Sequence, residues 1–473
     1  MDEKSADYGT QNFIELKAQK GMGFMKRKIM AMALAASMAA TMLAGCSSSS
    51  SNVETTTTKS GETTTAGNGQ AATGGVVDGY ESYAKRTDLT TEDITLTVWE
   101  SANGPDEFIK QAAQDFQKIY PNITIKFDKV ESTDAKDKIA ADGPSGLGPD
   151  LFAAANDNLG TMAAAGSIQP LDDVDASYVQ AVKDNTEEIC VNGVTYDNKV
   201  WGFPVARETY TILYNKSLIE SIPDNWEDLV KACEEWNAAH KGKYALMWEA
   251  GNTYHNVFWL TGSTVNMFGE NHDDFSKGIG FNNETSIKNA KYYQSLRKRI
   301  LDVKSGDLDQ ATIVSAFENG ECAMVIDGSW KIGAYEKALG DNLAAATLPK
   351  LPGEDKPVSN FAGIRTMYVS YYSEYPKEAA AFGEFLMCKE MQQKRLEITS
   401  SIPCRNDVNI DDEVMKVFIE QLDNYSFAMP SIPQINMYWT CYNTLYQSIW
   451  NGDDPAKLIS EAEELFIGFT AEN

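Results

Sequence analysis

The chain has 473 residues, and 43% of them are hydrophobic. It contains 41 Lys and Arg and 68 Asp and Glu, which gives a formal net charge of −27. This charge argues against nucleic acid and against an anionic membrane surface as ligands, because both would repel the protein. The length is sufficient for two packed domains in addition to the N-terminal segments described next.

The first element along the chain is a predicted secretory signal that begins at Met25. Basic residues at 26–28 precede the apolar run 29–43, and the sequence Leu-Ala-Gly-Cys ends the segment. A short basic region, a short apolar region and small residues at a cleavage site are typical of an exported protein. The apolar run is too short for a membrane-spanning helix. We therefore predict a signal peptide over 1–45, and we expect 1–24 to precede the true translation start.

The Leu-Ala-Gly-Cys sequence resembles the bacterial lipobox, whose Cys is diacylated and becomes the first residue of the mature chain. On this resemblance we predict lipidation of Cys46. Two acyl chains would anchor the protein stably, whereas a single chain binds a membrane with an association constant of only about 10⁴ M⁻¹. Residues 46–89 are predicted as a linker rich in Ser, Thr and Gly, with too few apolar side chains to order it. The expected location is the outer face of the cell membrane of a bacterium, which we expect to be Gram-positive.

The folded body is predicted to begin with a strand, a helix and a strand. Apolar residues alternate with Thr over 94–98, a helix pattern follows from Pro105, and alternation returns over 123–127. This βαβ unit predicts a parallel sheet with helices on its faces. Similar units recur up to a last helix with Asp454 as its N-cap and Pro455 in its first turn. Ligands of such α/β folds bind beyond the carboxyl ends of strands or between domains.

Motifs for catalysis and for metal binding are missing from the sequence. The three His residues are scattered, and neither HExxH, GxSxG nor a phosphate-binding GxxxxGK[ST] loop occurs. We predict a protein that is not an enzyme and that has no metal site and no cofactor. The remaining cysteines could pair in an exported protein, but their connectivity cannot be read from sequence. Because several lie in apolar runs, we expect buried free thiols at Cys190, Cys233, Cys322, Cys388, Cys404 and Cys441.

Four stretches, in the same order and spacing, resemble the maltose/maltodextrin-binding proteins of ABC importers. They are Gly148–Asp157, Trp201–Glu208, Ala316–Trp330 and Met429–Trp439. The resemblance implies an α/β, two-lobed periplasmic-binding-protein-like fold with a multi-pass hinge and a ligand cleft between the lobes. The lobes would comprise 90–206 plus 366–407 (the N-terminal lobe) and 209–364 plus 409–473 (the C-terminal lobe).

The same resemblance implies a function in sugar import. The protein would be a monomeric substrate-binding lipoprotein that captures malto-oligosaccharides outside the cell and delivers them to ABC permease subunits. Closure of the two lobes would trap the sugar. Three alternatives remain open: another oligosaccharide such as a xylo- or fructo-oligomer, a secreted glycoside hydrolase, and a partner of a membrane sensor.

A sugar presents hydroxyls around its edge and apolar C–H faces, so its site needs polar side chains in the ring plane and aromatic rings above and below. Carried over by the resemblance, the stacking residues are Trp330, Trp439 and Tyr254. The polar residues are Glu208, Asp157, Asn156, Asn252, Asn103 and Asp106. Pattern alone would also allow a core role for Trp439, a surface role for Glu208 and helix capping by Asp106.

Asn252 stands where the family has a Glu, and three further positions depart from the family pattern. Ala154 replaces a stacking Trp, and Asn158 and Asn443 each replace an Arg. These changes make one subsite smaller, so we expect maltotriose or longer α-glucans to bind more tightly than maltose.

Overall fold

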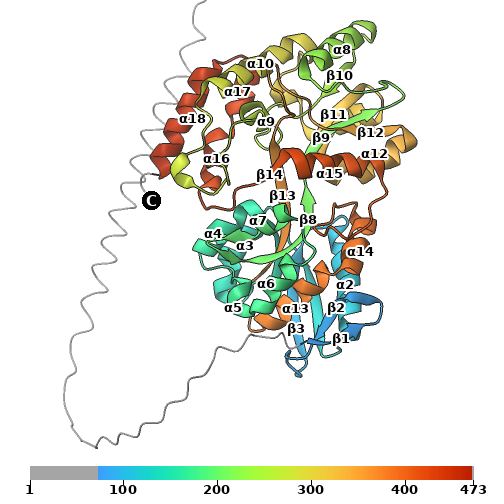
Figure 1. Cartoon of the computed structure of the whole chain (residues 1–473), viewed down its shortest axis with the longest axis vertical. Coiled ribbons are helices and arrows are strands. Elements are labelled where there is room, and N and C mark those ends of the chain that lie inside the picture. The colour runs from blue at the N-terminus through green and yellow to red at the C-terminus, as the bar shows by residue number, and fades with distance from the viewer. Residues whose placement is uncertain (1–72, 471–473) are drawn as a thin grey trace, which may run out of the picture. The chain divides into compact units, whose positions relative to one another are not determined.

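The computed structural model describes residues 73–470, so the predicted signal peptide, Cys46 and the first part of the predicted linker lie outside the described residues. The described part forms two α/β lobes, each built on its own sheet (Figure 1). We call the lobe with the six-stranded sheet lobe one and the lobe with the four-stranded sheet lobe two. No helix within 73–470 has the length and hydropathy needed to cross a membrane.

The sheet of lobe one has the order β14-β13-β5-β3-β4, and β8 also pairs with β13. Its strands are β3 (Ile94–Glu100), β4 (Ile123–Lys129), β5 (Leu151–Ala155), β8 (Gly202–Glu208), β13 (Asn360–Val369) and β14 (Ser426–Ala428). The pairing of β3 with β4 is parallel, with α2 (Pro105–Ile119) between them in the chain, so the predicted βαβ unit is confirmed. The other helices of this lobe are α3 (Ala135–Asp142), α4 (Leu159–Ala164), α5 (Leu171–Val174), α6 (Ala176–Lys183), α7 (Glu188–Gly193), α13 (Pro376–Met387) and α14 (Lys389–Thr399). A two-stranded hairpin, β6 (Thr195–Tyr196) and β7 (Lys199–Val200), follows α7.

The sheet of lobe two has the order β10-β11-β9-β12. Its strands are β9 (Tyr210–Asn215), β10 (Tyr244–Met247), β11 (Cys322–Gly328) and β12 (Leu343–Ala346). Its helices are α8 (Trp226–Ala239), α9 (Phe258–Thr261), α10 (Glu284–Ile300), α11 (Gln310–Glu318), α12 (Ile332–Leu339), α15 (Glu413–Tyr425), α16 (Ile435–Tyr442), α17 (Leu445–Asn451) and α18 (Pro455–Thr470). The predicted start of the last helix is confirmed, since α18 begins at Pro455.

Side-chain caps explain where several helices of lobe two begin. Asn225 accepts a hydrogen bond from the Asp228 backbone N–H at the start of α8, and Asn283 accepts one from Ser286 at the start of α10. Each cap satisfies a backbone donor that the helix itself leaves free, a contribution of about 1 kcal/mol.

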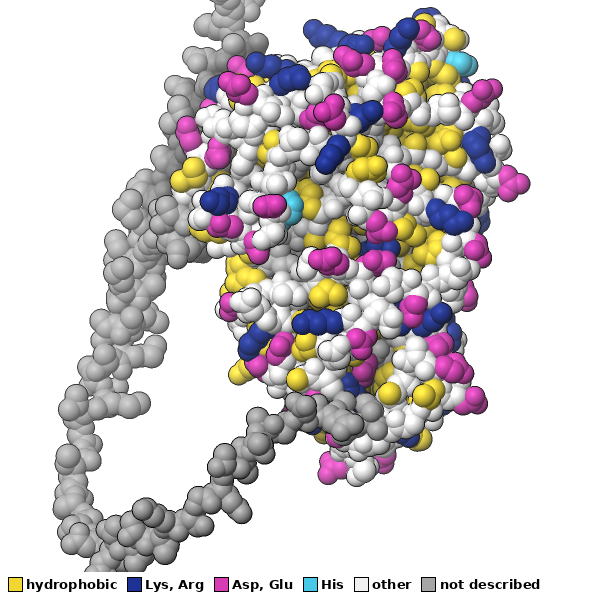
Figure 2. Space-filling view, in the orientation of Figure 1, with side chains coloured by type: hydrophobic (Ala, Val, Ile, Leu, Met, Phe, Trp, Pro, Cys, Tyr) yellow, Lys and Arg dark blue, Asp and Glu magenta, His cyan; other side chains and the backbone are white. Residues whose placement is uncertain are grey.

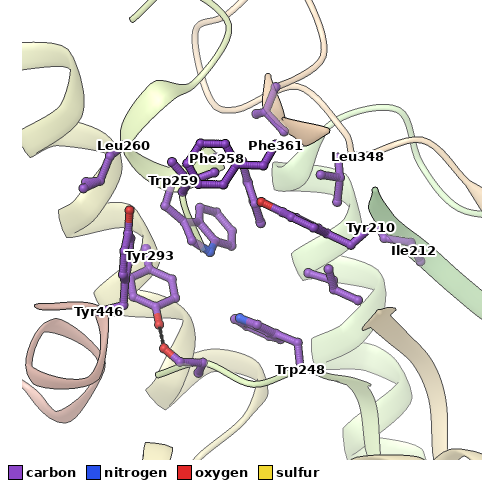
Figure 3. Close-up of a cluster of buried hydrophobic side chains, with 14 of the residues drawn as sticks. Tyr210, Ile212, Trp248, Phe258, Trp259, Leu260, Tyr293, Leu348, Phe361 and Tyr446 are labelled. Carbon is purple, nitrogen blue, oxygen red and sulfur yellow. Dashed lines mark hydrogen bonds between the residues drawn. The ribbon is translucent and has the colours of Figure 1, made fainter. Parts of the chain in front are cut away.

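The core of lobe two is dominated by aromatic side chains (Figure 3). Trp248 and Trp259 are fully buried, and both indole N–H groups donate to the Asn256 side-chain oxygen, at 3.0 and 3.2 Å. Tyr293 packs on Trp259 with ring centroids 5.1 Å apart and donates its hydroxyl to the Ala250 carbonyl (Figure 3). These large, closely packed rings make this lobe a stiff support for the loops at its edge.

The chain passes between the lobes at several points that are bonded to one another. Thr209 separates β8 from β9, and its hydroxyl donates to the Phe361 carbonyl at 2.8 Å. Asn360 donates to the Tyr210 carbonyl at 2.8 Å, and the Arg207 backbone N–H donates to the Ile402 carbonyl at 3.0 Å. These contacts tie the passes into one hinge.

The edges of the predicted lobes do not coincide with the sheets. Residues 360–364 were assigned to the C-terminal lobe, yet they are the first half of β13 in the sheet of lobe one. Residues 426–428, also assigned to the C-terminal lobe, form β14 and pair with β13 in the same sheet. The remaining lobe boundaries stay a prediction.

The predicted linker needs a correction at its C-terminal end. β1 (Thr73–Val77) and β2 (Tyr80–Arg86) form an antiparallel hairpin inside the range 46–89. Tyr83 is buried and packs edge-on against Phe385, with ring centroids 5.2 Å apart. The Arg86 guanidinium pairs with Glu384 at 2.8 Å. The prediction rested on the average composition of the whole stretch, to which these few anchoring side chains contribute little.

All six cysteines of the described part are buried, and none forms a disulfide, as expected for free thiols. Asp and Glu side chains are spread over both lobes rather than gathered in one patch on the face that Figure 2 shows. The acidic excess therefore marks no single ligand site on that face.

Candidate functional site

A cavity of about 850 Å³ lies where the two lobes meet. Its walls come from Thr133, Lys136, Ala155, Asp157, Asn158, Glu208, Tyr254, Trp330, Arg365, Met429, Asn436, Met437, Trp439 and Thr440. Five of the predicted site residues are therefore brought together, namely Trp330, Trp439, Tyr254, Glu208 and Asp157. They come from segments that are up to 282 residues apart in the chain.

Trp330 lies directly after β11 and presents its ring to the cavity. The residue is 41% exposed, which is unusual for Trp and shows that it does not belong to a core. The indole folds back over Gly328, where an added Cβ would come within 2.2 Å of the ring. His255 stacks on the indole with centroids 5.9 Å apart and an interplanar angle of 20°. The ring is thus supported on one side and open on the other.

Tyr254 and Trp439 flank a common buried ring, that of Phe361. Tyr254 stacks on Phe361 at 5.9 Å, and Trp439 packs against it at 5.7 Å. Trp439 lies on α16 and is partly buried. It packs against the core of lobe two and also lines the cavity. Together with Trp330, these rings form an aromatic wall that can cover the C–H faces of a sugar.

Asp157 follows β5 and holds Trp439 in place. The Trp439 indole N–H donates to the Asp157 carboxylate at 3.0 Å. Burial raises the pKa of Asp157 above its ordinary value, while the hydrogen bond from Trp439 and the nearby Lys136 oppose this rise. The carboxylate has further lone pairs that can accept from a ligand hydroxyl.

Glu208 ends β8 and is the second carboxylate of the cavity. Burial raises its pKa, and the guanidinium groups of Arg365 and Arg395 oppose the rise. The two carboxylates lie in one cavity with three aromatic rings, which is the combination that sugar recognition requires.

Four predicted ligand residues do not line the cavity. Asn156 is fully buried, donates to the Met429 carbonyl at 2.7 Å and accepts from the Ile364 backbone N–H at 3.0 Å. Asn252 accepts from the backbone N–H groups of Tyr254 and His255 at 2.9 and 3.0 Å. Both amides therefore brace the backbone near the site.

The other two of these residues, Asn103 and Asp106, lie at the start of α2. Asn103 takes a left-handed backbone conformation with φ of 63°. Asp106 accepts from the Gly104 backbone N–H at 3.2 Å and pairs with Lys110 at 2.8 Å. The alternative of a helix-capping role for Asp106 agrees with these contacts, and the structure gives neither residue a place in the cavity.

Ala154, Asn158 and Asn443, which depart from the family pattern, lie in three different environments. Asn158 lines the cavity, Ala154 is fully buried in the core of lobe one, and Asn443 is exposed outside the lining. A small residue at 154 therefore leaves no ring to project toward a ligand.

Sequence reasoning missed Arg365 and Lys136, the two cationic side chains of the cavity. Arg365 is the only charged residue of β13, a strand that is otherwise apolar or neutral. A charge inside such a strand is costly unless it is paired, and this could have marked the position as special.

A larger cavity of about 1030 Å³ opens elsewhere along the junction of the lobes and contains none of the predicted site residues. Its wall is acidic, with Glu187, Glu188, Asp197 and Asp423 among its residues. The His272 and Phe427 rings there stack on each other at 4.1 Å. No group of three or more potential metal ligands occurs within the described residues.

Comparison with known proteins decides the family. The model of the bacterial extracellular solute-binding proteins matches residues 111–417. The chain belongs to this family. The prediction of a binding protein that is not an enzyme is confirmed on this ground, since the family comprises extracellular binding proteins. The two-lobed fold is confirmed by the similarity to the solved structure described next.

Three similar proteins illustrate the relationship. A galactooligosaccharide-binding protein of Bacillus subtilis is 29% identical over 395 residues, or 79% of this chain and 89% of the relative. A maltooligosaccharide ABC transporter solute-binding lipoprotein of Streptococcus pneumoniae is 27% identical over 413 residues, or 82% and 92%. A crystal structure of a cyclo/maltodextrin-binding protein complexed with maltotetraose superposes with a TM-score of 0.70 and 28% identity, covering 81% of this chain and 98% of that one. The predicted resemblance to the maltodextrin-binding proteins of ABC importers is confirmed.

Proposed function

We propose that this protein captures malto-oligosaccharides outside the cell and delivers them to the permease of an ABC importer. The observation that carries the proposal is the cavity between the lobes, in which three accessible aromatic rings face two carboxylates. The volume of about 850 Å³ falls in the range of small-molecule sites, about 300–1,000 Å³. Relatives that are named for binding malto-oligosaccharides support the choice of sugar.

Each side chain has a proposed role. Trp330, Tyr254 and Trp439 stack on the C–H faces of successive sugar rings, because an apolar face gains most from an aromatic partner. Glu208 and Asp157 accept hydrogen bonds from sugar hydroxyls at the ring edge. Asn156 and Asn252 keep a supporting role, since their amide groups are occupied by backbone partners.

The membrane attachment is part of the same proposal. Cys46 carries two acyl chains, and the segment after it connects the anchor to the hairpin β1–β2 at lobe one. A protein held at the membrane meets a permease in that membrane far more often than a free one does. Mass spectrometry of the processed protein tests this directly, since a mature chain that starts elsewhere than at Cys46 would contradict it.

Calorimetric titration of residues 73–473 with malto-, galacto-, xylo- and fructo-oligosaccharides tests the choice of sugar. We expect the malto series to bind most tightly. A preference for galacto-oligosaccharides is the second candidate, because the relative with 29% identity is named for that ligand. Chromatography of the recovered sugar should show it intact, whereas cleaved sugar would favour a hydrolase.

A further inference from the structure

Arg365 is one of the charged side chains that line the cavity. It lies in β13 opposite Ala155 of β5 on one side and Ala206 of β8 on the other. Asp157 and Glu208 come two residues after these alanines. Because residues two apart in a strand share a face, Glu208 points to the same side of the sheet as Arg365. The two small alanines leave room for the long Arg side chain.

Buried Glu100 fixes the orientation of the Arg365 guanidinium. Arg365 donates through Nε to Glu100 Oε2 at 3.2 Å and through Nη2 to Glu100 Oε1, and Nη2 also donates to the Ser101 hydroxyl at 2.8 Å. Glu100 is fully buried, while the Arg365 side chain keeps 16% exposure. No described residue accepts a hydrogen bond from Nη1, and Arg365 is one of the residues that line the cavity. A planar guanidinium whose Nε and Nη2 groups are hydrogen-bonded presents its remaining N–H donors in a defined direction.

A second buried guanidinium, that of Arg395, lies near Glu100. Arg395 is 1% exposed, its nearest carboxylate oxygen is that of Glu100 at 3.7 Å, and its three nitrogens have no hydrogen-bond partner among the described residues. With Glu208 ionised, the two arginines balance Glu100 and Glu208. A neutral ligand keeps this cluster balanced, whereas a carboxylate on the ligand would add an uncompensated negative charge to a buried site.

We propose that Arg365 and Glu208 form a paired subsite for two adjacent hydroxyls of a neutral sugar. Arg365 Nη1 donates to one hydroxyl, and the Glu208 carboxylate accepts from its neighbour. Arg has only donors and ionised Glu has only acceptors, while a hydroxyl can do both, so an adjacent diol satisfies the pair. Glu100 acts as a positioning residue through Arg365. This inference deepens the proposed function and rests on it.

Calorimetry with maltotetraose, a neutral galacto-tetrasaccharide and a tetra-galacturonate tests the pair. Arg365→Gln should weaken the best neutral ligand about tenfold or more, because it removes a hydrogen bond from a charged group. Arg365→Lys keeps the charge without the fork and should fall between the wild type and Arg365→Gln. The matched control is Arg86→Gln, which breaks the Arg86–Glu384 ion pair away from the cavity and should leave the affinity unchanged. Circular dichroism checks that each variant is folded.

A double-mutant cycle tests the positioning role of Glu100. If Glu100 acts through Arg365, then Glu100→Gln should weaken binding in the wild type and have little further effect in Arg365→Gln. A purely structural role would give additive losses in the two backgrounds instead.

The outcomes separate the two proposals. Unchanged affinity in folded Arg365→Gln would overturn the paired subsite while the sugar assignment stands. Preference for the galacto-tetrasaccharide with a loss in Arg365→Gln would overturn the malto assignment while the subsite stands. Tighter binding of the tetra-galacturonate than of either neutral sugar would overturn both the sugar assignment and the paired subsite. A complete lack of binding of the two neutral sugars would overturn both proposals as well.

Discussion

The two lobes contribute different chemistry to the cavity. Lobe one supplies mainly polar and charged side chains: Thr133, Lys136, Asp157, Asn158, Glu208 and Arg365. Lobe two supplies the three aromatic rings, Tyr254, Trp330 and Trp439, together with Met437 and two polar residues of α16, Asn436 and Thr440. All the charged side chains of the cavity therefore come from lobe one, and all its aromatic rings come from lobe two.

This division ties binding to lobe closure. A ligand on lobe one alone would leave its apolar faces in water, and a ligand on lobe two alone would lack the charged partners for its hydroxyls. The full binding free energy is available only when both walls contact the sugar, so the ligand favours the closed arrangement. The hydrogen bond between Asp157 and Trp439 already joins the two walls in the present structure.

The largest effect is expected from breaking the buried support of the polar wall. Glu100→Ala leaves two buried guanidiniums without their anion and should lower the free energy of unfolding by about 3–5 kcal/mol. Urea denaturation followed by circular dichroism measures it. Glu413→Ala, which breaks an exposed pair with Lys416, is the matched control and should change little. Equal effects in the two variants would show that burial of the cluster does not matter.

The aromatic wall should show the next largest effect, on binding rather than on stability. Trp330→Ala and Trp439→Ala should each weaken sugar binding by about 1 kcal/mol or more, roughly fivefold, because each removes a stacking face. Calorimetry checks this, with Trp201→Ala as the control, since Trp201 is half-buried in lobe one outside the cavity. Unchanged affinity in both variants would remove these rings from the site.

Only the polar wall should make binding depend on pH. Burial raises the pKa of Asp157, so its carboxylate gains a proton above the ordinary range near pH 4. Affinity should fall as the pH is lowered through that raised pKa, because a protonated carboxyl loses acceptor capacity. For the same reason Asp157 favours folding at low pH, and this contribution is lost as the pH rises through the raised pKa.

Titrations between pH 4 and 7 measure this dependence. Asp157→Asn cannot titrate and should bind more weakly at pH 7 with a flatter profile. A profile identical to that of the wild type would show that Asp157 does not control the acid limb.

The smallest effect is expected from ligand length. Because Ala154 is buried and Asn158 is short, the polar wall offers less contact at one end, so maltotriose and longer glucans should bind more tightly than maltose by a few-fold. Calorimetry across the malto series decides this. Maltose as the tightest ligand would contradict the expectation.

The sequence alone predicted the parts of the protein that depend on local pattern. Alternation and helical spacing predicted β3, α2 and β4, and Asp454 with Pro455 marked the last helix. The family motifs predicted five residues that the cavity brings together. These predictions succeed because strands, caps and motif loops are encoded by residues close together in the chain.

The tertiary structure decided which polar residues remain free to meet a ligand. Asn156 carries a suitable amide, yet it donates to the Met429 carbonyl, which is 273 residues away in the chain. Arg365 lines the cavity while Glu100, 265 residues earlier in the chain, accepts hydrogen bonds from its guanidinium.

The N-terminal anchor and the cavity show the same contrast. The export signal and Cys46 are read from consecutive residues, so the sequence by itself determined that prediction. The pairing of a polar wall with an aromatic wall, the hairpin inside the predicted linker and the Arg365–Glu208 pair depend on contacts between distant segments. Such contacts follow from how strands align in a sheet and how lobes meet, and no local pattern encodes them.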